Sequence, residues 1–469
     1  MEAVLQQGTE YATVSEAAAM IRSGKVSAVE LTRLMLGRIE AMNGRLNAFI
    51  TVTGELALEQ AARADRELAD GHDRGPLHGI PVAIKDLIDT RGVRTTGGSR
   101  HYEARVPESD ATVVARLREA GAVMLGKTGL HEMAFGSTSI NPFFGAISNP
   151  WRLDHHPGGS SGGSAVAVAA GLAYAALGTD TGCSVRQPAQ CCGIVGHKPT
   201  FGLVSKAGVL PLVSSMDHVG PITRCVRDAG LVLQAIAGAD AGDPLTLAGP
   251  SDDFLKHLEE PIDGTVVGIP RDYFFEGGDS EVVSVVEQSL EVFSGLGARL
   301  REVAFPDCEA AYRAGDATFS EIVDANGTAL EEDPEGFSEA FHARYREVAQ
   351  YRGEAYEAAQ RYRRDFNREV KNVMRSCDVL ATPTSTIAAA PIQSQPPDHA
   401  KERRKNACIF DFTGQPSISV PCGFTAAGLP VGLMLTGDVR DDSTVLRFAR
   451  AFERATPWHE CHPPGLIEQ

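Results

Sequence analysis

The chain has 469 residues, of which 43% are hydrophobic and 22% charged, and its formal net charge is −17. This composition is typical of a folded globular protein and excludes disordered and collagen-like chains. The negative charge opposes both a phosphate backbone and an anionic membrane surface, so we expect no nucleic-acid partner and no membrane association.

The sequence also predicts a cytoplasmic protein without a metal or a cofactor. Its N-terminal residues lack the basic and apolar segments of a signal peptide. The longest apolar run, residues 165–178, is shorter than the roughly 20 residues that a membrane-spanning helix needs. Nine cysteines, an odd number, are typical of reduced thiols, and none of them has the spacing of a zinc site.

Helices are predicted at the start of the chain. Two pairs, Thr13 with Glu16 and Ser27 with Glu30, have the spacing of a helix-capping box and precede apolar-periodic runs. Residues 56–69 predict a third helix with one charged face. After these helices, short apolar strands are separated by glycine and proline and alternate with helices.

This order of elements predicts an α/β fold, a single α/β/α domain with a central twisted mixed β-sheet flanked by helices. We expect one domain over residues 1–469. Its segments are N-terminal helices at about 10–70, a core at about 75–225, a variable helical insertion at about 281–373, and C-terminal strands with a final helix at 374–469. The insertion is the most polar part of the chain, and we expect it to shape a pocket.

Residues 121–128, GAVMLGKT, match the written pattern of a phosphate-binding loop. Such a loop needs flexible residues whose N–H groups surround a phosphate before a helix begins. Here the residues between Gly121 and Gly126 are apolar and predict a strand. We therefore favour a buried strand over a nucleotide site, which would need Lys127 to bind ATP.

Lys85 and a Gly/Ser-rich region, residues 155–202, are the strongest candidates for catalysis. Lys85 ends the apolar segment GIPVAIK, a place where a lysine is more often ion-paired or reaches solvent. The segment GGSSGG contains Ser160 and permits close approach of the backbone to other segments. Ser184 follows in GTDTGCSVR, whose successive N–H groups favour binding of an oxyanion. A low-complexity linker is the alternative, but the region continues directly into an Ala-rich helix and a strand.

Together these segments resemble the amidase signature family along nearly the whole chain. The matching segments are GIPVAIKDLID, LGKTGLHEMAFGS, NPWRLDHHPGGSSGGSAVAVAAG, GTDTGCSVRQPAQCCGIVGHKPTFGLVS, SSMDHVGPITR and FTGQPSISVPCGFTAAGLPVGLMLTG. The resemblance implies a Ser–cis-Ser–Lys catalytic triad of Lys85, Ser160 and Ser184, in which a cis peptide bond precedes Ser160. The separations of 75 and 24 residues along the triad agree with the family pattern.

The resemblance also implies a mechanism. Ser184 attacks the carbonyl carbon to form an acyl-enzyme, and Ser160 relays its proton to Lys85. Because Lys85 accepts a proton only when neutral, burial must lower its pKa by about two to three units from about 10.4. The oxyanion hole is expected to consist of the N–H groups of Thr181, Gly182, Cys183 and Ser184.

Supporting and substrate-binding residues follow from the same resemblance. Asp180 and Arg186 are expected to brace the turn without transferring protons. The residues expected to contact substrate are Met133, Ala134, Phe135, Gly136 and Gly159. With the rest of residues 133–138, the variable region after Tyr312 and residues 409–412, they predict an apolar cavity with few fixed charges.

Cys183 is the clearest departure, since most family members have glycine at this position. A cysteine nucleophile is therefore an alternative to Ser184. Cys183, however, is one residue out of register with the other two members of the triad, and the sequence places no histidine to activate it.

Other cysteines and histidines in the region are expected to be structural. Cys191 and Cys192 are more often buried as small hydrophobic residues than reactive. His131, His155 and His156 do not have the spacing of a metal-ligand set, and we expect them to be solvated or buried.

The predicted function is that of an amidase, a serine hydrolase that cleaves the C–N bonds of small linear amides, and also of carbamates, urethanes or aryl acylamides. We expect a monomer or a homodimer with no cofactor. The alternative is the amidase (A) subunit of a glutamyl-tRNA(Gln) amidotransferase, which shares the triad. The polar residues 281–373 and Cys183 favour the independent amidase.

Overall fold

The structure is a computed structural model that describes residues 8–249, 252–396 and 399–464. Eleven strands within these ranges form one mixed sheet. In spatial order they are β1 (Phe49–Val52), β3 (Val123–Thr128), β2 (Pro81–Lys85), β6 (Ala175–Asp180), β8 (His218–Thr223), β7 (Val195–Lys198), β12 (Ser417–Phe424), β13 (Pro430–Thr436), β11 (Val379–Pro383), β9 (Val266–Ile269) and β10 (Arg299–Glu302). A separate hairpin pairs β4 (Ile140–Asn141) with β5 (Gly145–Ala146).

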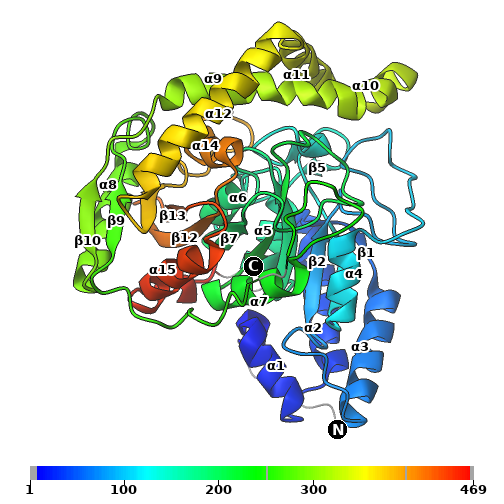
Figure 1. The fold of residues 1–469 in the computed structure, drawn as a ribbon. Helices are drawn as coiled ribbons and strands as arrows, with labels where there is room; N and C mark the ends of the chain where they lie inside the picture. The colour runs from blue at the N-terminus through cyan, green and yellow to red at the C-terminus, as the bar shows by residue number, and fades with distance from the viewer. Residues whose placement is uncertain (1–7, 250–251, 397–398, 465–469) are drawn as a thin grey trace.

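Helices flank this sheet, as Figure 1 shows. In chain order they are α1 (Val14–Arg22), α2 (Ala28–Leu46), α3 (Gly54–Ala69), α4 (Thr112–Glu119), α5 (Gly162–Ala169), α6 (Arg186–Cys192), α7 (Val226–Ile236), α8 (Ser280–Gly295), α9 (Cys308–Thr318), α10 (Ile322–Glu332), α11 (Glu339–Ala349), α12 (Glu354–Met374), α13 (His399–Glu402), α14 (Lys405–Thr413) and α15 (Asp442–Arg454). The arrangement confirms the predicted α/β fold with a central mixed sheet.

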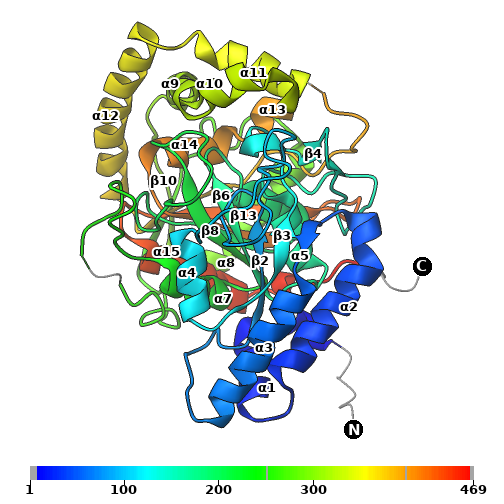
Figure 2. The same cartoon turned by 90° about the vertical axis from the view of Figure 1, so that its right-hand side faces the viewer.

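The N-terminal helices α1–α3 and the helices α9–α12 lie at opposite ends of the molecule (Figures 1 and 2). None of the helices in the described ranges combines the length and the apolar character that crossing a membrane requires.

Both predicted capping boxes are present at the start of the chain. The Glu16 N–H donates to Thr13 Oγ1 at 3.1 Å, and the Thr13 N–H donates to the Glu16 carboxylate at 2.8 Å. Ser27 and Glu30 make the same pair of bonds at 3.1 and 2.7 Å. These bonds satisfy N–H groups that the first turn of a helix leaves unpaired, so α1 and α2 begin where the sequence predicts.

Six of the eight residues that match a phosphate-loop pattern form strand β3, which is buried along its whole length. Lys127 Nζ donates to the carbonyl oxygen of Ile88 at 2.5 Å and to Thr95 Oγ1 at 2.7 Å, and it lies 3.8 Å from Asp86. Because this segment is a buried strand, no loop is available to surround a phosphate. The apolar residues between Gly121 and Gly126 predicted this strand.

One strand lies inside the segment that was expected to be a helical insertion. Residues 299–302 form β10, which pairs in parallel with β9 at the edge of the sheet. Three of its four residues are exposed. An edge strand with little buried surface has no alternating apolar pattern, so nothing in the sequence indicated it.

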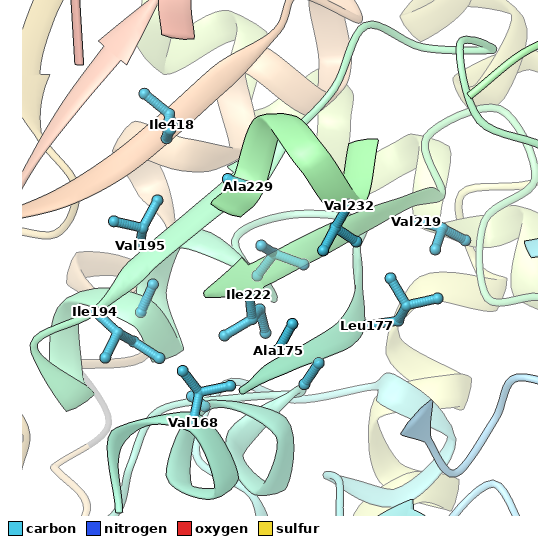
Figure 3. Close-up of a cluster of buried hydrophobic side chains, with 14 of the residues drawn as sticks. Val168, Ala175, Leu177, Ile194, Val195, Val219, Ile222, Ala229, Val232 and Ile418 are labelled. Atoms are coloured by element: carbon cyan, nitrogen blue, oxygen red, sulfur yellow. The ribbon is translucent and has the colours of Figure 1, made fainter. Parts of the chain in front are cut away.

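The core beside the site is built from small residues. Figure 3 shows Leu177 of β6 and Ile222 of β8 in one cluster with Val168 of α5 and Val232 of α7. Every residue of α5 is buried. A Cβ at Gly163 would lie 2.5 Å from backbone atoms of neighbouring segments, so α5 packs at a distance that only glycine allows. In the loop that leads into α5, the Ser161 hydroxyl donates to the carbonyl oxygen of Thr179 at 3.2 Å, which fixes this loop against the end of β6.

We expect Gly126→Ala to destabilise the edge of the sheet. Gly126 has a φ of +152°, and a Cβ there would lie 2.2 Å from the carbonyl oxygen of Thr51 in β1. The pairing of β1 with β3 must then shift, which we expect to cost about 2–3 kcal/mol and to lower the urea midpoint of unfolding. Gly44→Ala is the control, because Gly44 is exposed in α2 with no atom within 4 Å of an added Cβ. Alanine there should raise the midpoint slightly, and an unchanged midpoint for Gly126→Ala would contradict the expected clash with β1.

Candidate active site

Two neighbouring parallel strands bring the predicted site residues together. β2 and β6 run in parallel, with Ile84 opposite Leu177. Lys85 at the end of β2 and Asp180 at the end of β6 therefore lie at the same edge of the sheet. The loop before α5 reaches this edge too, since the Ser161 N–H donates to the carbonyl oxygen of Ser184 at 3.2 Å. In α/β proteins this edge is the usual place for a ligand site.

Lys85 is fully buried, and its side chain contacts hydroxyl groups. Its Nζ lies 2.7 Å from Ser160 Oγ and 2.8 Å from Thr179 Oγ1. Burial lowers the pKa of Lys85 to about 7, although the carboxylates of Asp180 and Asp217 oppose this shift. A large fraction of Lys85 is therefore neutral and able to accept a proton near pH 7.

The segment that carries Ser160 is held tightly on both sides. The peptide bond between Gly159 and Ser160 is cis. The carbonyl oxygen of Ser160 accepts the His131 N–H at 3.1 Å and the Ser139 hydroxyl at 3.2 Å. A Cβ at Gly159 would lie 2.7 Å from backbone nitrogens of the neighbouring segment, so this position has no room for a side chain. These contacts hold the Ser160 hydroxyl beside Lys85.

Asp180 and Arg186 hold the turn that follows β6. Asp180 Oδ2 accepts the Val185 N–H at 3.0 Å and Arg186 Nε at 2.9 Å. Arg186 also donates to Asp411 at 2.5 Å, and all three charged side chains are fully buried. Burial opposes ionisation of Asp180, yet the Arg186 guanidinium holds the pKa of this carboxyl below its usual range. The turn is thus braced by a buried ion network.

Residues 181–184 of this turn line a cavity. The N–H groups of Thr181, Gly182, Cys183 and Ser184, the predicted oxyanion donors, donate to no acceptor in the described part of the chain. Thr181 is fixed by its hydroxyl, which donates to Asp217 at 2.6 Å. No hydrogen bond joins the hydroxyls of Ser160 and Ser184 among the described residues. The structure thus joins Lys85 to Ser160 directly and places Ser184 on the cavity wall.

Cys183 fits the turn without strain. Its backbone lies outside the left-handed region, so glycine is not required here for its conformation. The Sγ atom lies 3.7 Å from the carbonyl oxygen of Gly159, and the side chain is 3% exposed. Burial raises the pKa of the Cys183 thiol to about 12. A thiol that stays protonated at neutral pH is a poor nucleophile, which favours Ser184.

The cavity in front of this turn has a volume of about 470 Å³. Its wall contains residues 134–138, residues 181–184, residues from the segment between α9 and α12, and four residues that precede α14, namely Gln395, Ala400, Arg403 and Arg404. Of the residues expected to contact substrate, Ala134, Phe135 and Gly136 lie in this wall.

Other expected contacts lie elsewhere. Met133 is not part of the wall and packs against Gly97, where an added Cβ would come within 2.8 Å of its sulfur. Gly159 is also outside the wall, and a Cβ there would lie 2.7 Å from the backbone nitrogens of residues 138–139. Residues 409–412 are buried within α14 and do not line the cavity.

The expectation of few fixed charges in the cavity is wrong. Arg344, Arg403 and Arg404 line it together with Glu132. These arginines have no signal in the sequence, because they stand in polar stretches where arginine usually covers a solvent-exposed face. Only the packing of α11 and of the segment before α14 over the site turns them inward.

The three histidines near the site are accounted for by burial or by an acidic neighbour. Burial lowers the pKa of His131 to about 4 and that of His156 to about 3, so both are neutral at pH 7. His155 Nδ1 lies 2.7 Å from Asp154. Cys191 and Cys192 are buried as expected, and burial raises the pKa of each thiol.

Comparison with known proteins agrees with this fold along nearly the whole chain. The glutamyl-tRNA(Gln) amidotransferase A subunit of Roseiflexus sp. (strain RS-1) is 40% identical over 97% of this chain and 99% of its own length. The structure of the same subunit from Thermotoga maritima is 34% identical, with a TM-score of 0.81 over 97% of this chain and 96% of its own. The native peptide amidase from Stenotrophomonas maltophilia is 32% identical, with a TM-score of 0.87 over 98% and 99%.

These findings define an enzyme that acts on the C–N bond of amides. The family model described as Amidase matches residues 30–446. The chain belongs to this Amidase family, as the resemblance of its motifs predicted.

One prediction needs correction. We expected only a small-molecule substrate, no nucleic acid and a monomer or homodimer. The relatives at about 40% identity are named as one subunit of an enzyme, and that name includes a tRNA. The inference failed because the net charge of −17 describes the whole surface. It excludes neither a neutral or basic local surface nor a second subunit that binds nucleic acid.

Proposed function

We propose that the chain hydrolyses carboxamides through an acyl-enzyme on Ser184, as the amidase subunit of an amidotransferase that acts on a tRNA-linked substrate. The observation that carries the catalytic part is the 2.7 Å contact between Lys85 Nζ and Ser160 Oγ in a buried site. The assignment to an amidotransferase is supported by the full-length relatives of that name at 40% identity.

In the first step of this proposal, Ser184 Oγ attacks the carboxamide carbon. Its proton passes through the Ser160 hydroxyl to the neutral amine of Lys85. The carbonyl oxygen becomes an oxyanion, and the free N–H groups of Gly182, Cys183 and Ser184 stabilise its charge. Since the turn is braced by Arg186, these donors need no rearrangement as the charge develops.

In the second step, the C–N bond breaks. Lys85 returns its proton through Ser160 to the leaving nitrogen, so ammonia or an amine departs and Ser184 carries the acyl group. Water then attacks the ester with Lys85 again accepting a proton, and this proton returns through Ser160 to Ser184 Oγ as the ester C–O bond breaks and the acid is released. Lys85 thus ends each half-reaction neutral, ready for the next.

A second candidate function is that of an independent hydrolase of small amides, outside an amidotransferase. The same acyl-enzyme chemistry would also hydrolyse carbamates. The likeness to peptide amidase supports this second candidate.

Replacement of Ser184 by alanine tests the nucleophile. We expect Ser184→Ala to lower kcat by at least about a thousandfold, since the acyl-enzyme cannot form. Cys183→Ala is the matched control on the neighbouring residue and should keep most of the activity. Ammonia release from a primary amide, measured with each purified variant, gives the comparison. Full activity of Ser184→Ala together with loss in Cys183→Ala would make the thiol the nucleophile.

The pKa of Lys85 predicts the pH profile. With its pKa at about 7, Lys85 is protonated below that pH and neutral above it. We therefore expect kcat/KM for an uncharged amide to rise about tenfold per pH unit below pH 7 and to level off above it. The Lys85→Met variant should have a low kcat/KM that does not rise between pH 5 and pH 7. A flat wild-type profile from pH 5 to 9 would contradict the assignment of Lys85 as base.

The assignment to an amidotransferase is tested on the protein from its own cells. We expect the tagged chain to purify with a partner, and the complex to amidate glutamyl-tRNA with glutamine or another primary carboxamide as nitrogen donor. Ser184→Ala should keep the partner and lose amidation. A chain that purifies alone, hydrolyses amides fully and supports no amidation would favour the second candidate.

A further inference from the structure

The outer side of helix α12 carries a row of positive charges. Figure 2 shows this helix at the left-hand margin of the molecule. Exposed cationic side chains stand at every third or fourth position toward its C-terminal end, namely Arg361, Arg364, Arg368, Lys371 and, directly after the helix, Arg375. Residues with this spacing share one side of a helix, and the row extends over about 20 Å. We call it the basic face of α12.

Ion pairs with acidic neighbours leave this face positive. Arg361 lies 3.7 Å from Glu357, and Arg368 lies 2.6 Å from Asp365. The two arginine side chains are 58% and 77% exposed, so solvent screens both pairs. Such weak pairs leave each guanidinium available to a second anion.

The other three cations have no acidic partner. Arg364 and Lys371 make no salt bridge with any residue that the structure describes. Arg375 Nη1 donates to the amide oxygen of Asn372 at 3.2 Å, which leaves its charge unpaired. Cations in the last turn of a helix stabilise the helix dipole, and this accounts for Lys371 and Arg375. Arg364 lies well before the last turn, so the dipole does not explain it.

The edge of the sheet continues the basic face. Arg301 of β10 is exposed, and its Nη1 donates to the carbonyl oxygen of Ser376 at 2.7 Å. Arg301 therefore lies beside the C-terminal end of α12. This positive surface is local, because the whole chain carries a net charge of −17.

The composition of the face favours a nucleic acid over a protein as its partner. The exposed apolar residues of α12 are Ala355 and Ala358, and both precede the basic face. The centres of protein interfaces are enriched in aromatic residues and methionine and are poor in lysine. Contacts to phosphates, in contrast, come from arginine and lysine side chains without an apolar surface. The phosphate backbone of an RNA is also a dense line of negative charges, which suits a row of cations.

We propose that the basic face of α12 binds the phosphate backbone of the tRNA that carries the substrate. The arginines suit this role because a planar guanidinium binds two phosphate oxygens through two N–H groups. Contacts to phosphates do not read the base sequence, so this face orients the tRNA and does not select it. This inference rests on the proposed assignment to an amidotransferase.

A triple variant of the basic face tests the proposal. Arg364→Gln, Arg368→Gln and Lys371→Gln together remove three charges, and glutamine keeps the helix because its helix propensity is similar. The enzyme is purified from its own cells with any partner, and its affinity for a fluorescently labelled tRNA transcript is measured by anisotropy. We expect the affinity to fall at least about tenfold, and the slope of log affinity against log salt concentration to decrease by about two to three.

A second triple variant is the matched control. Arg33→Gln, Arg63→Gln and Arg66→Gln remove the same charge from exposed positions of α2 and α3, at the opposite end of the molecule. This control should keep the affinity for tRNA and the salt dependence of the unmodified enzyme. Both variants should release ammonia from a primary amide at the unmodified rate, because neither changes a residue of the active site.

Three results would overturn the proposal. One is an unmodified enzyme that does not bind the tRNA, and another is equal affinity of the two triple variants for it. The third is loss of a co-purifying protein from the basic-face variant, since the face then binds an acidic protein.

Amidation assays separate this inference from the proposed function. An enzyme that binds tRNA through the basic face but never amidates it contradicts the assignment to an amidotransferase and leaves the inference standing. Amidation with an unchanged KM for tRNA in the basic-face variant supports the assignment and contradicts the inference.

Discussion

Burial of the Lys85 amine among hydroxyl groups is the constraint on which the rest of the site depends. A lysine in this position loses its proton readily because the charged form is desolvated. Asp180, one strand away, would reverse the effect if it paired with Lys85. Arg186 instead binds both oxygens of Asp180 and supplies a compensating positive charge. The ion network that braces the turn therefore also helps to keep the pKa of Lys85 low, so that its amine is neutral and able to accept a proton.

The sheet explains why such distant residues meet. Parallel pairing of β2 with β6 fixes the two strand ends at one edge, and the close packing of α5 brings the Ser160 segment to the same place. The packing of the Ser160 segment depends on the absence of a side chain at Gly159, and that of α5 on its absence at Gly163. Position in this site is thus set by backbone contacts, which are less tolerant of change than contacts between flexible side chains.

The sequence predicted the parts of the molecule that have local signals. Capping boxes marked α1 and α2, and the apolar run ending in Lys85 marked β2. The motifs around Ser160 and Ser184 indicated the candidate site. The cavity wall had no such signal, because the inward direction of Arg344 and Arg403 depends on how helices far along the chain pack over the site. The edge strand β10 was missed for a related reason, since an exposed strand has no buried pattern.

The two sides of the cavity come from different parts of the fold. Residues 134–138 and 181–184 belong to the segments around the sheet, whereas Arg344 belongs to helix α11, at the end of the molecule away from the N-terminal helices. Substitutions in α11 can therefore alter which acyl group is accepted without displacing a strand that carries Lys85 or Asp180. In evolutionary terms, this division lets selectivity diverge while the bond-breaking apparatus is inherited intact.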